Sequence, residues 1–221
     1  MIDKNIHVSY SLQTKPYHKI VANLVEKYSS NDAKILDVGC GAGNLLVEIN
    51  RRIGGAVISA ADIDQNCLNL VAEKVPVEES FLIKDVEDLF VDNNRKSYDV
   101  IILSHVLEHV KRPYDTIVGL KSLLNSDGVL ILAVPNPVRP DNIMLSFFRN
   151  YRVNLGHVQT WDQAHWRNFL ENILELDVLE YPTDFIRVPF FDRFSLLHPL
   201  LILLAKIFPG FSRSCMAVVR S

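Results

Sequence analysis

The chain has few cysteines and no cysteine pair. Its three cysteines, Cys40, Cys67 and Cys215, lie far apart in the 221 residues. An odd number without a C-x-x-C pattern excludes a disulfide framework and a cysteine-ligated zinc site. Residues 1–5 also lack the apolar run of a secretory signal peptide. Because unpaired cysteines are typical of a reducing compartment, we expect a cytoplasmic protein.

The sequence also lacks an excess of positive charge and a long hydrophobic run. Lys and Arg number 23 against 26 Asp and Glu, so the net charge of -3 argues against nucleic acid as the main partner. The longest apolar stretch, 196–208, contains His198, Pro199 and Lys206 and is too short for a transmembrane helix. We predict a core or dimer helix there. A peripheral membrane contact is the alternative, which the missing basic face disfavours.

The rest of the composition is that of one globular domain. Hydrophobic residues make up 48% of the chain and charged residues 22%, and both fractions are ordinary for a folded domain. A length of 221 residues exceeds one average domain and falls short of two. We therefore predict a single domain, 1–221, that carries insertions.

Strand-like apolar runs alternate with helix-like periods in the first two thirds of the chain. Strands are predicted at 34–38, 56–61, 81–83, 98–103 and 129–134, with a turn at 125–128. Helices are predicted at 16–28, 66–75 and 113–124, and around Leu45, Leu46 and Ile49. This alternation predicts a doubly wound α/β fold with a parallel sheet buried on both faces.

The pattern changes after Pro140. Residues 141–159 carry aromatic and basic side chains, such as Phe147 and Arg152, without a clean period. A capping box at 160–163 predicts a helix whose inward side chains are Trp166, Phe169, Leu170, Ile173 and Leu174. Two more strands are predicted at 176–181 and 215–219. We interpret 137–160 as a lid or acceptor insertion, and 182–213 as a C-terminal insertion before the last strand.

A glycine turn follows the first strand and opens a helix, as in nucleotide-binding α/β folds. A dinucleotide site requires G-x-G-x-x-G, but the glycines here are Gly39, Gly41 and Gly43. Asp37 lies two residues before the turn, where a carboxylate would repel a pyrophosphate and attract an ammonium group. S-adenosylmethionine carries an ammonium and a sulfonium and no phosphate. The charge at Asp37 therefore favours S-adenosylmethionine over NAD.

Acidic residues end the next two strands. Asp62 ends the second strand, where a carboxylate can accept hydrogen bonds from ribose hydroxyls. Asp85 follows the third strand and is placed to accept from an adenine amino group. Asp64 follows Asp62 two residues later and can be interpreted equally well as a cofactor ligand or as a helix cap. Cys40 is interpreted as a packed side chain, because nothing basic lies near it in sequence to activate a thiol.

These motifs resemble class I S-adenosylmethionine-dependent methyltransferases, and in particular the subgroup that includes ubiquinone-biosynthesis O-methyltransferases. The resemblance runs from residue 16 to about 181. Its motifs are Ile35–Gly43, Ser104–Val110 with Pro113, Asn125–Gly128, Val134–Asn136 and Gly156–Val158. It implies a seven-stranded, mostly parallel sheet whose last strand is antiparallel. The segment 182–213 departs from the simplest family members.

The resemblance also implies which residues contact the cofactor. The expected S-adenosylmethionine-binding residues are Asp37, Gly39, Cys40, Gly41, Asp62, Ile63, Asp85, Val86 and Ser104. Beyond the sulfur of the cofactor, family members place the methyl acceptor. The acceptor itself cannot be identified from sequence, because acceptor pockets are built from insertions and termini. A quinone precursor, a glycan sugar and a lipid-linked intermediate are the candidates.

Three residues after the fourth strand allow several interpretations. His105, Glu108 and His109 spell the H-x-x-E-H of some zinc proteases, but Pro113 leaves too little room for a long helix. Quinone-pathway relatives have E-x-x-E-H here and hold a divalent cation with it. His105 replaces the first carboxylate of that motif, so we predict no metal. Either His105 or His109 acts as a base toward an acceptor hydroxyl, or the group only stabilises the loop.

His157 lies in the predicted lid and is a third candidate base. We therefore predict an enzyme that methylates a small molecule at a hydroxyl oxygen, with His105, His109 and His157 as catalytic residues. One alternative is a binding module that keeps S-adenosylmethionine without catalysis. The other is an NAD-dependent oxidoreductase, which Asp37 and the missing third glycine disfavour.

Overall fold

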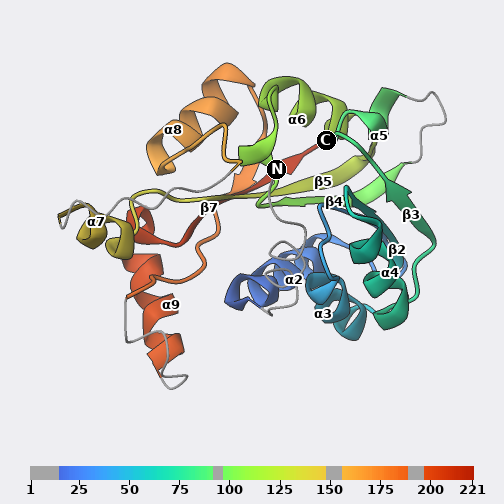
Figure 1. Cartoon of the computed structure of the whole chain (residues 1–221), viewed down its shortest axis with the longest axis horizontal. Helices are drawn as coiled ribbons and strands as arrows, with labels where there is room; N and C mark the ends of the chain where they lie inside the picture. The colour runs from blue at the N-terminus through green and yellow to red at the C-terminus, as the bar shows by residue number, and fades with distance from the viewer. Residues whose placement is uncertain (1–14, 92–96, 148–155, 189–196) are drawn as a thin grey trace.

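The computed structural model describes residues 15–91, 97–147, 156–188 and 197–221. It contains a seven-stranded sheet in the order β3-β2-β1-β4-β5-β7-β6, with helices on both faces (Figure 1). The strands are β1 (Lys34–Val38), β2 (Val57–Asp62), β3 (Glu79–Leu82), β4 (Tyr98–Ser104), β5 (Leu124–Pro135), β6 (Val178–Glu180) and β7 (Ser214–Arg220). Neighbours from β3 to β5 are parallel, and β7 is antiparallel to both β5 and β6. The predicted fold class is confirmed.

The helices form two layers (Figure 1). One layer contains α2 (Pro16–Tyr28), α3 (Asn44–Arg52) and α4 (Gln65–Lys74). The other contains α5 (Asp88–Val91), the 3-10 helix η1 (Leu107–His109), α6 (Pro113–Lys121), and α8 (Gln163–Arg167) with the π-helical turn η2 (Asn168–Ile173). Each layer buries its apolar side chains in a separate cluster against the sheet.

The central strands are buried on both faces, which explains their continuous apolar sequences. Successive residues of β4 contribute to opposite clusters: Val100 and Ile102 pack with the α2–α4 layer, whereas Ile101 and Leu103 pack with the α6–α8 layer. Burial of such side chains contributes about 1.5–3 kcal/mol each. The sheet is therefore held mainly by apolar burial, and its carboxyl ends are left to carry polar side chains.

The turn predicted at 125–128 is instead part of β5. Asn125 donates from its side-chain amide to Asp99 Oδ1 at 2.6 Å, and the pairing of β4 with β5 shifts register between Tyr98 and Val100. A bulge therefore accommodates the turn-forming residues within the strand. The helix predicted at 113–124 ends earlier, at Lys121, because Leu124 already pairs with β4.

Two predictions about the C-terminal third are wrong in detail. A regular helix, α7 (Pro140–Phe147), occupies part of the segment in which no period was recognised. Helix α8 is capped by Asp162, whose Oδ1 accepts from the backbone of Ala164 and His165 at 2.9 Å, and not by the predicted capping box. The π-helical turn that follows shifts the inward face, so Ile173 is 53% exposed.

The C-terminal insertion forms α9 (His198–Ile207) and the 3-10 turn η5 (Pro209–Phe211) before β7 begins. An isolated bridge between Ile186 and Ser212 ties the two ends of this insertion together. In the view of Figure 1, α7 and α9 lie on the same side of the molecule, away from the sheet. Among the described residues, none of the helices has the length and apolar character that crossing a bilayer requires.

Candidate functional site

The glycine turn lies at the carboxyl end of β1, where the strand neighbours β2 and β4. Gly39, Gly41 and Gly43 adopt positive φ of 76°, 52° and 76°, a region that side chains disfavour. A Cβ on Gly39 would lie 2.2 Å from Val106 Cγ2. Because Val106 precedes η1, the glycine turn and the histidine-bearing loop pack directly against each other.

Asp62 holds the glycine turn to the end of β2. Its Oδ2 accepts from the backbone of Gly41 at 2.8 Å, and its Oδ1 accepts from Asp64 at 3.0 Å. The side chain is buried. Its Oδ2 also accepts weakly from Cys40 Sγ at 4.0 Å. A carboxylate offers about four acceptor positions, so these bonds leave room for an expected ribose hydroxyl. The structure thus adds a structural role for Asp62 to its predicted ligand role.

Asp37 is a buried acid without a hydrogen bond among the described residues, and it is only 2% exposed. Burial raises its pKa to about 7, and the nearby negative charge of Asp62 adds to this rise. A carboxyl group in this condition is stabilised as an anion only if a cation approaches it. The site therefore fits the ammonium of S-adenosylmethionine. The contact between Asp37 and the cofactor stays a prediction.

Ser104, at the end of β4, provides a second unsatisfied polar atom. Its Oγ is buried and has no hydrogen-bond partner in the part of the chain that the structure describes. Buried hydroxyls are nearly always bonded, so this oxygen indicates a place where a ligand or water belongs. The predicted cofactor contact at Ser104 fits this observation.

The remaining predicted cofactor residues differ in exposure. Ile63 is 64% exposed beside Asp62 and can pack against a flat nucleoside ring. Asp85 is exposed just after β3, whereas Val86 is buried in the core, so only its backbone remains for a ligand. Cys40 is buried, and burial raises the pKa of its thiol. The burial of Cys40 and the raised pKa of its thiol agree with its interpretation as a packed side chain.

The loop after β4 carries a buried carboxylate between two histidines. Glu108 Oε1 lies 3.7 Å from His105 Nδ1 and 3.9 Å from His109 Nε2, while its side chain is 2% exposed. The Glu108 carbonyl accepts from the backbone of Val158 at 2.8 Å, which brings the predicted lid to this loop. The loop is the three-residue helix η1, so the zinc-protease interpretation fails, because that motif requires a longer helix.

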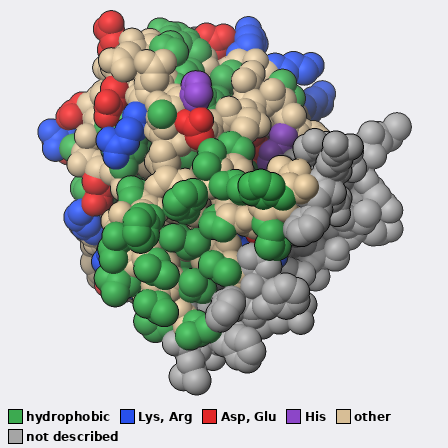
Figure 2. Space-filling model, turned by 90° about the vertical axis from the view of Figure 1, so that its left-hand side faces the viewer, with side chains coloured by type: hydrophobic (Ala, Val, Ile, Leu, Met, Phe, Trp, Pro, Cys, Tyr) green, Lys and Arg blue, Asp and Glu red, His purple; other side chains and the backbone are tan. Residues whose placement is uncertain are grey.

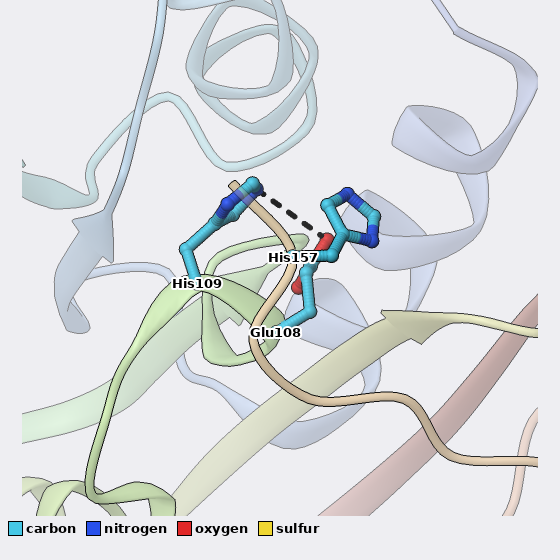
Figure 3. Close-up of side chains that lie close together, drawn as sticks. All are labelled: Glu108, His109 and His157. Atoms are coloured by element: carbon cyan, nitrogen blue, oxygen red, sulfur yellow. Dashed lines mark ion pairs between the residues drawn. The ribbon is translucent and has the colours of Figure 1, made fainter. Parts of the chain in front are cut away.

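Glu108, His109 and His157 point toward one another (Figure 3). Their ligand atoms all lie within 4.8 Å of one another, a spacing that would suit a metal ion. His109 Nδ1 lies 3.0 Å from the Gly156 carbonyl, which can only accept, so Nδ1 carries the proton. In neutral His109 the Nε2 lone pair therefore faces the Glu108 carboxylate. Two acceptors in that arrangement need a proton or a cation between them.

His157 is held neutral by its surroundings. Burial lowers the pKa of its imidazole, although the Glu108 carboxylate opposes this shift. Its ring meets that of His109 edge-on, with centroids 4.8 Å apart. A neutral imidazole beside a carboxylate can accept a proton and be stabilised as an imidazolium. The predicted role of His157 as a general base stays a prediction.

His105 occupies a strained position. Its φ is 58°, which is uncommon for a residue with a side chain, and its Nε2 lies 3.3 Å from Ser214 Oγ. Positive φ at a non-glycine residue is found preferentially at functional sites. His105 and His109 both lie within 4 Å of Glu108 Oε1, and His157 offers a ring nitrogen within 4.8 Å of the same side chain, so the structure brings all three predicted histidines to one carboxylate.

Helix α2 contributes two residues that the sequence did not identify as site residues. The Tyr17 ring lies 4.7 Å from that of His105 and 4.6 Å from that of His18. Burial lowers the pKa of His18 to about 4, and the positive charges of Lys15, His105 and Arg213 contribute. The sequence showed Tyr17 only as part of an apolar helix face. Nothing in a local pattern could reveal its contact with a loop far along the chain.

A hollow of about 430 Å³ lies at the opposite end of the sheet, lined by residues such as Lys34, Ser59 and Tyr98. These residues belong to the amino-terminal halves of their strands. Ligands of open α/β sheets bind outside the carboxyl ends, where the unsatisfied Ser104 Oγ and Glu108 Oε2 lie. We therefore assign the site to the carboxyl ends.

Comparisons with known sequences match a family model and curated relatives. A family model described as "Methyltransferase domain" matches residues 11–173. A malonyl-[acyl-carrier protein] O-methyltransferase of Halalkalibacterium halodurans is 31% identical over 134 residues, 57% of this chain and 49% of that protein. A ubiquinone biosynthesis O-methyltransferase of Haemophilus ducreyi is 34% identical over 110 residues, 47% of this chain and 45% of that protein. The chain thus spans about half the length of these curated relatives.

Solved structures share the fold at low sequence identity. A SAM dependent methyltransferase from Aquifex aeolicus superposes with a TM-score of 0.63 at 14% identity, covering 100% of this chain and 98% of that chain. A plantazolicin methyltransferase, solved with a monoazolic desmethyl analogue and SAH, gives a TM-score of 0.63 at 17% identity, covering 99% and 90%.

Proposed function

This chain belongs to the class I S-adenosylmethionine-dependent methyltransferases, and from that premise we propose that it methylates a hydroxyl oxygen of a small molecule. When bound, S-adenosylmethionine supplies a methyl group on a positively charged sulfur. The chain's own residues must hold the cofactor, orient the acceptor and remove the hydroxyl proton. The observation that carries the proposal is the packing of the histidine loop directly on the glycine turn through Val106 and Gly39.

The cofactor side of the site offers acceptors for positive and hydroxylated groups. Asp37 supplies a buried carboxyl beside the negative Asp62, and Ser104 supplies a buried hydroxyl that has no partner among the described residues. Asp62 keeps acceptor positions free while it fixes the turn. These groups would hold the ammonium, the ribose and neighbouring atoms in one orientation, and orientation is the main catalytic requirement of an in-line transfer.

On the acceptor side, His157 is the base that we propose. Its lowered pKa keeps it neutral near pH 7, so it can take the proton from an acceptor hydroxyl. Glu108 stabilises the imidazolium that results. His105 and His109 flank the same carboxylate and position it, and each remains a candidate for the proton transfer. General base catalysis of this kind contributes about 10²–10⁴-fold.

The relatives support oxygen as the acceptor atom, because both are named O-methyltransferases. Their names place those two proteins in malonyl-[acyl-carrier protein] methylation and in ubiquinone biosynthesis, and a hydroxylated small molecule is the acceptor class we propose here. The NAD-dependent alternative has no support from the family or from the carboxylate at Asp37. A binding module without catalysis remains the competing proposal, and turnover decides between them.

A metal-assisted variant of this function is favoured by one observation. In neutral His109 an acceptor nitrogen faces the Glu108 carboxylate, and a divalent cation between them would remove the repulsion. Glu108, His109 and His157 would be its ligands. Such an ion would lower the pKa of a coordinated acceptor hydroxyl and replace the need for a base.

The test is turnover of the purified chain with a set of hydroxylated small molecules. S-adenosylhomocysteine release and the mass of the methylated product are measured for the wild type and for His105→Gln, His109→Gln and His157→Gln. We expect His157→Gln to lower turnover by about 10²–10⁴-fold with little change in the Kd of the cofactor. His165→Gln is the matched control, because His165 is exposed and bonded to Asp162. Unaltered turnover in all three variants would remove the base from the mechanism, and no release with any acceptor would favour the binding module.

A further inference from the structure

The C-terminal insertion is apolar on its outside and polar where it joins the sheet. Helix α9 has one buried side and a second apolar stripe that faces outward, formed by Leu200, Leu203 and Ile207. Figure 2 shows hydrophobic side chains gathered over this side of the molecule. Asp184 near the beginning of the insertion and Ser214 just after its end are completely buried. The polar groups of these two residues therefore face other parts of the protein.

Asp184 ties the beginning of the insertion to its end. One carboxylate oxygen, Oδ1, accepts from the backbone of Phe185 at 2.8 Å, of Arg213 at 2.8 Å and of Ser214 at 3.2 Å. The other oxygen, Oδ2, is buried and has no hydrogen-bond partner among the described residues. Burial of an acid costs free energy unless donors surround it, so the three backbone donors fix the carboxylate. Asp184 in turn holds the first residue of β7 in one place.

Ser214 connects Asp184 to the histidine loop. It begins β7 and pairs with Pro135 at the carboxyl end of β5. Its Oγ lies 3.3 Å from His105 Nε2. The backbone of His105 donates to the Ala133 carbonyl of the same β5 at 2.8 Å, and this contact accompanies the strained φ of 58°. The His105 ring is thus anchored through both its backbone and its side chain.

The position of the proton on the His105 ring follows from what faces each nitrogen. Nδ1 lies 3.7 Å from Glu108 Oε1, and Glu108 Oε2 is buried without a hydrogen-bond partner among the described residues. Neutral His109 has no proton to offer Glu108, because its Nδ1 proton faces the Gly156 carbonyl. A proton on His105 Nδ1 is therefore favoured, since the carboxylate attracts it. The lone pair is then on Nε2, and the Ser214 hydroxyl must donate to it.

We propose that Ser214 is a positioning residue for methyl transfer: its hydroxyl donates to His105 Nε2 and thereby keeps the ring proton on Nδ1, toward Glu108. This inference rests on the proposed function, in which Glu108 stabilises the imidazolium of His157. A carboxylate that His105 holds keeps one orientation toward the base, and orientation contributes to the rate. Asp184 acts indirectly, because it fixes the backbone of Ser214.

Asp184 is the competing acceptor for the single proton of the Ser214 hydroxyl. Burial raises the pKa of Asp184, and a hydrogen bond from the Ser214 side chain is among the contacts that oppose this rise. If Asp184 took the proton, His105 Nε2 would have to donate to Ser214, and the Nδ1 lone pair would face Glu108. Asp184 already has three backbone donors, whereas Glu108 would then have no donor from His105. The donation to His105 is therefore the more favourable arrangement.

Nuclear magnetic resonance of the imidazole nitrogens tests the position of the proton. Long-range proton–nitrogen spectra distinguish the two tautomers, and the His105 signals are assigned by their loss in His105→Gln. They are recorded at about pH 8, where an ordinary imidazole is neutral, with EDTA to remove metal ions. We expect the Nδ1–H tautomer in the wild type, a change of tautomer in Ser214→Ala, and its restoration in Ser214→Thr. An Nε2–H tautomer in the wild type would overturn the proposal.

Turnover tests whether the contact matters for the reaction. Ser214→Ala should lower kcat by about tenfold, the effect of one lost hydrogen bond, without changing the Kd of S-adenosylmethionine. If Ser214 acts through His105, the double variant Ser214→Ala/His105→Gln should be no slower than His105→Gln alone. Ser212→Ala is the matched control, because it removes a buried hydroxyl that donates to the carbonyls of Pro209 and Ser214. It should keep the kcat and the His105 tautomer of the wild type.

A merely structural role of Ser214 would give different results. Losses of kcat that add up in the double variant, or a loss in Ser212→Ala as large as that in Ser214→Ala, would overturn the proposal. Thermal melting checks that each variant folds, and if Ser214→Ala does not fold, the tautomer of the wild type still decides. A wild type that releases no S-adenosylhomocysteine with any acceptor would refute the proposed function. The tautomer measurement needs neither cofactor nor acceptor, so the two failures are distinguishable.

Discussion

The two halves of the site differ in how far apart their residues lie along the chain. The cofactor half comes from the ends of three strands that are neighbours in the sheet: Asp37 from β1, Asp62 from β2 and Ser104 from β4. The acceptor half combines Tyr17 from α2 with residues of η1, the segment at 156–159 and β7. The first half is fixed by the order of the parallel strands. The second exists only once remote segments have packed.

The halves differ in charge as well. Each contains a buried acid, but Asp37 faces the negative Asp62, whereas Glu108 lies between His105 and His109. The ionised form of Asp37 is therefore stabilised only when a ligand brings a cation. Glu108 has protonatable partners within the protein. This contrast leads to the following predictions, in order of decreasing effect.

Asp62→Ala should have the largest effect on the cofactor half. The substitution removes both the anchor of Gly41 and the expected ribose acceptor, so the Kd of S-adenosylmethionine should rise by about 100-fold or more, as for a hydrogen-bonded buried charge. Titration calorimetry measures it. Asp64→Ala is the control, because Asp64 caps α4 through Asn66 and its loss should cost only about 1 kcal/mol of stability. Equal affinity in Asp62→Ala and the wild type would contradict the assignment.

Asp37→Asn should weaken cofactor binding and stabilise the free protein. Removing the charge eliminates the attraction for the ammonium, so we expect affinity to fall by about tenfold. In the wild type the pKa of Asp37 is raised to about 7. The free energy of unfolding is therefore highest below about pH 4, where Asp37 is neutral in the folded and the unfolded chain, and it falls as the pH rises toward 7 and the buried carboxyl must ionise. At pH 8 the free variant should therefore melt at a higher temperature. A melting temperature below that of the wild type would contradict this prediction, because it would show that the protein itself compensates the charge of Asp37 without a ligand.

His18→Gln tests the acceptor half by the opposite pH dependence. The pKa of His18 is lowered to about 4. Its contribution to the free energy of unfolding is therefore fully present above about pH 6.5, and it is lost as the pH falls toward 4. Over pH 4–7, His18 and Asp37 thus act in opposite directions. Denaturant unfolding should show stability falling more steeply with rising pH in His18→Gln, by about 1–3 kcal/mol across the window. Asp37→Asn should show the reverse slope, and parallel slopes in both variants would refute this account.

Chelation should have the smallest effect. If His157 acts as the base, turnover in the presence of EDTA should stay that of the untreated enzyme. The result would be different if EDTA removed turnover, Mg²⁺ restored it, and Glu108→Gln abolished the restored turnover. Those outcomes would assign the cluster of Glu108, His109 and His157 to a metal ion. The same pair of measurements thus separates the two mechanisms for the acceptor half.

Prediction from sequence succeeded where neighbouring residues decide the structure. The motif around Asp37 predicted a strand, a glycine turn and a helix, and all three are present. It was less successful where packing overrides local preference. Asn125 and its neighbours form turns in isolation, but Leu124 and Val129 on either side of them pair with β4, so they are held within β5 as a bulge. Helix α7 was not recognised, because its exposed residues include Ile143 and Phe147 and a helix with apolar side chains on its outer side shows no clear period.

The site shows the same limit. Asp62 was predicted from its place at the end of a strand, but its bond to Gly41 was not. His105, Glu108 and His109 were recognised together as one motif, whereas the approach of His157 to Glu108 and the contact of Tyr17 with His105 depend on the folded chain. The role of His157 as a base, like the cofactor contacts, remains a prediction for the experiments above.

The sequence by itself determined the alternation of strands and helices, the position of the glycine turn and the family. These depend on periodicity and spacing, which act over a few residues and are written directly in the chain. Only the tertiary structure decided that Asp37 is buried beside Asp62, that the histidines surround Glu108, and that the second apolar stripe of α9 faces outward. Burial and electrostatic interaction depend on distances in space, and a local pattern does not fix the distance between residues remote in the chain.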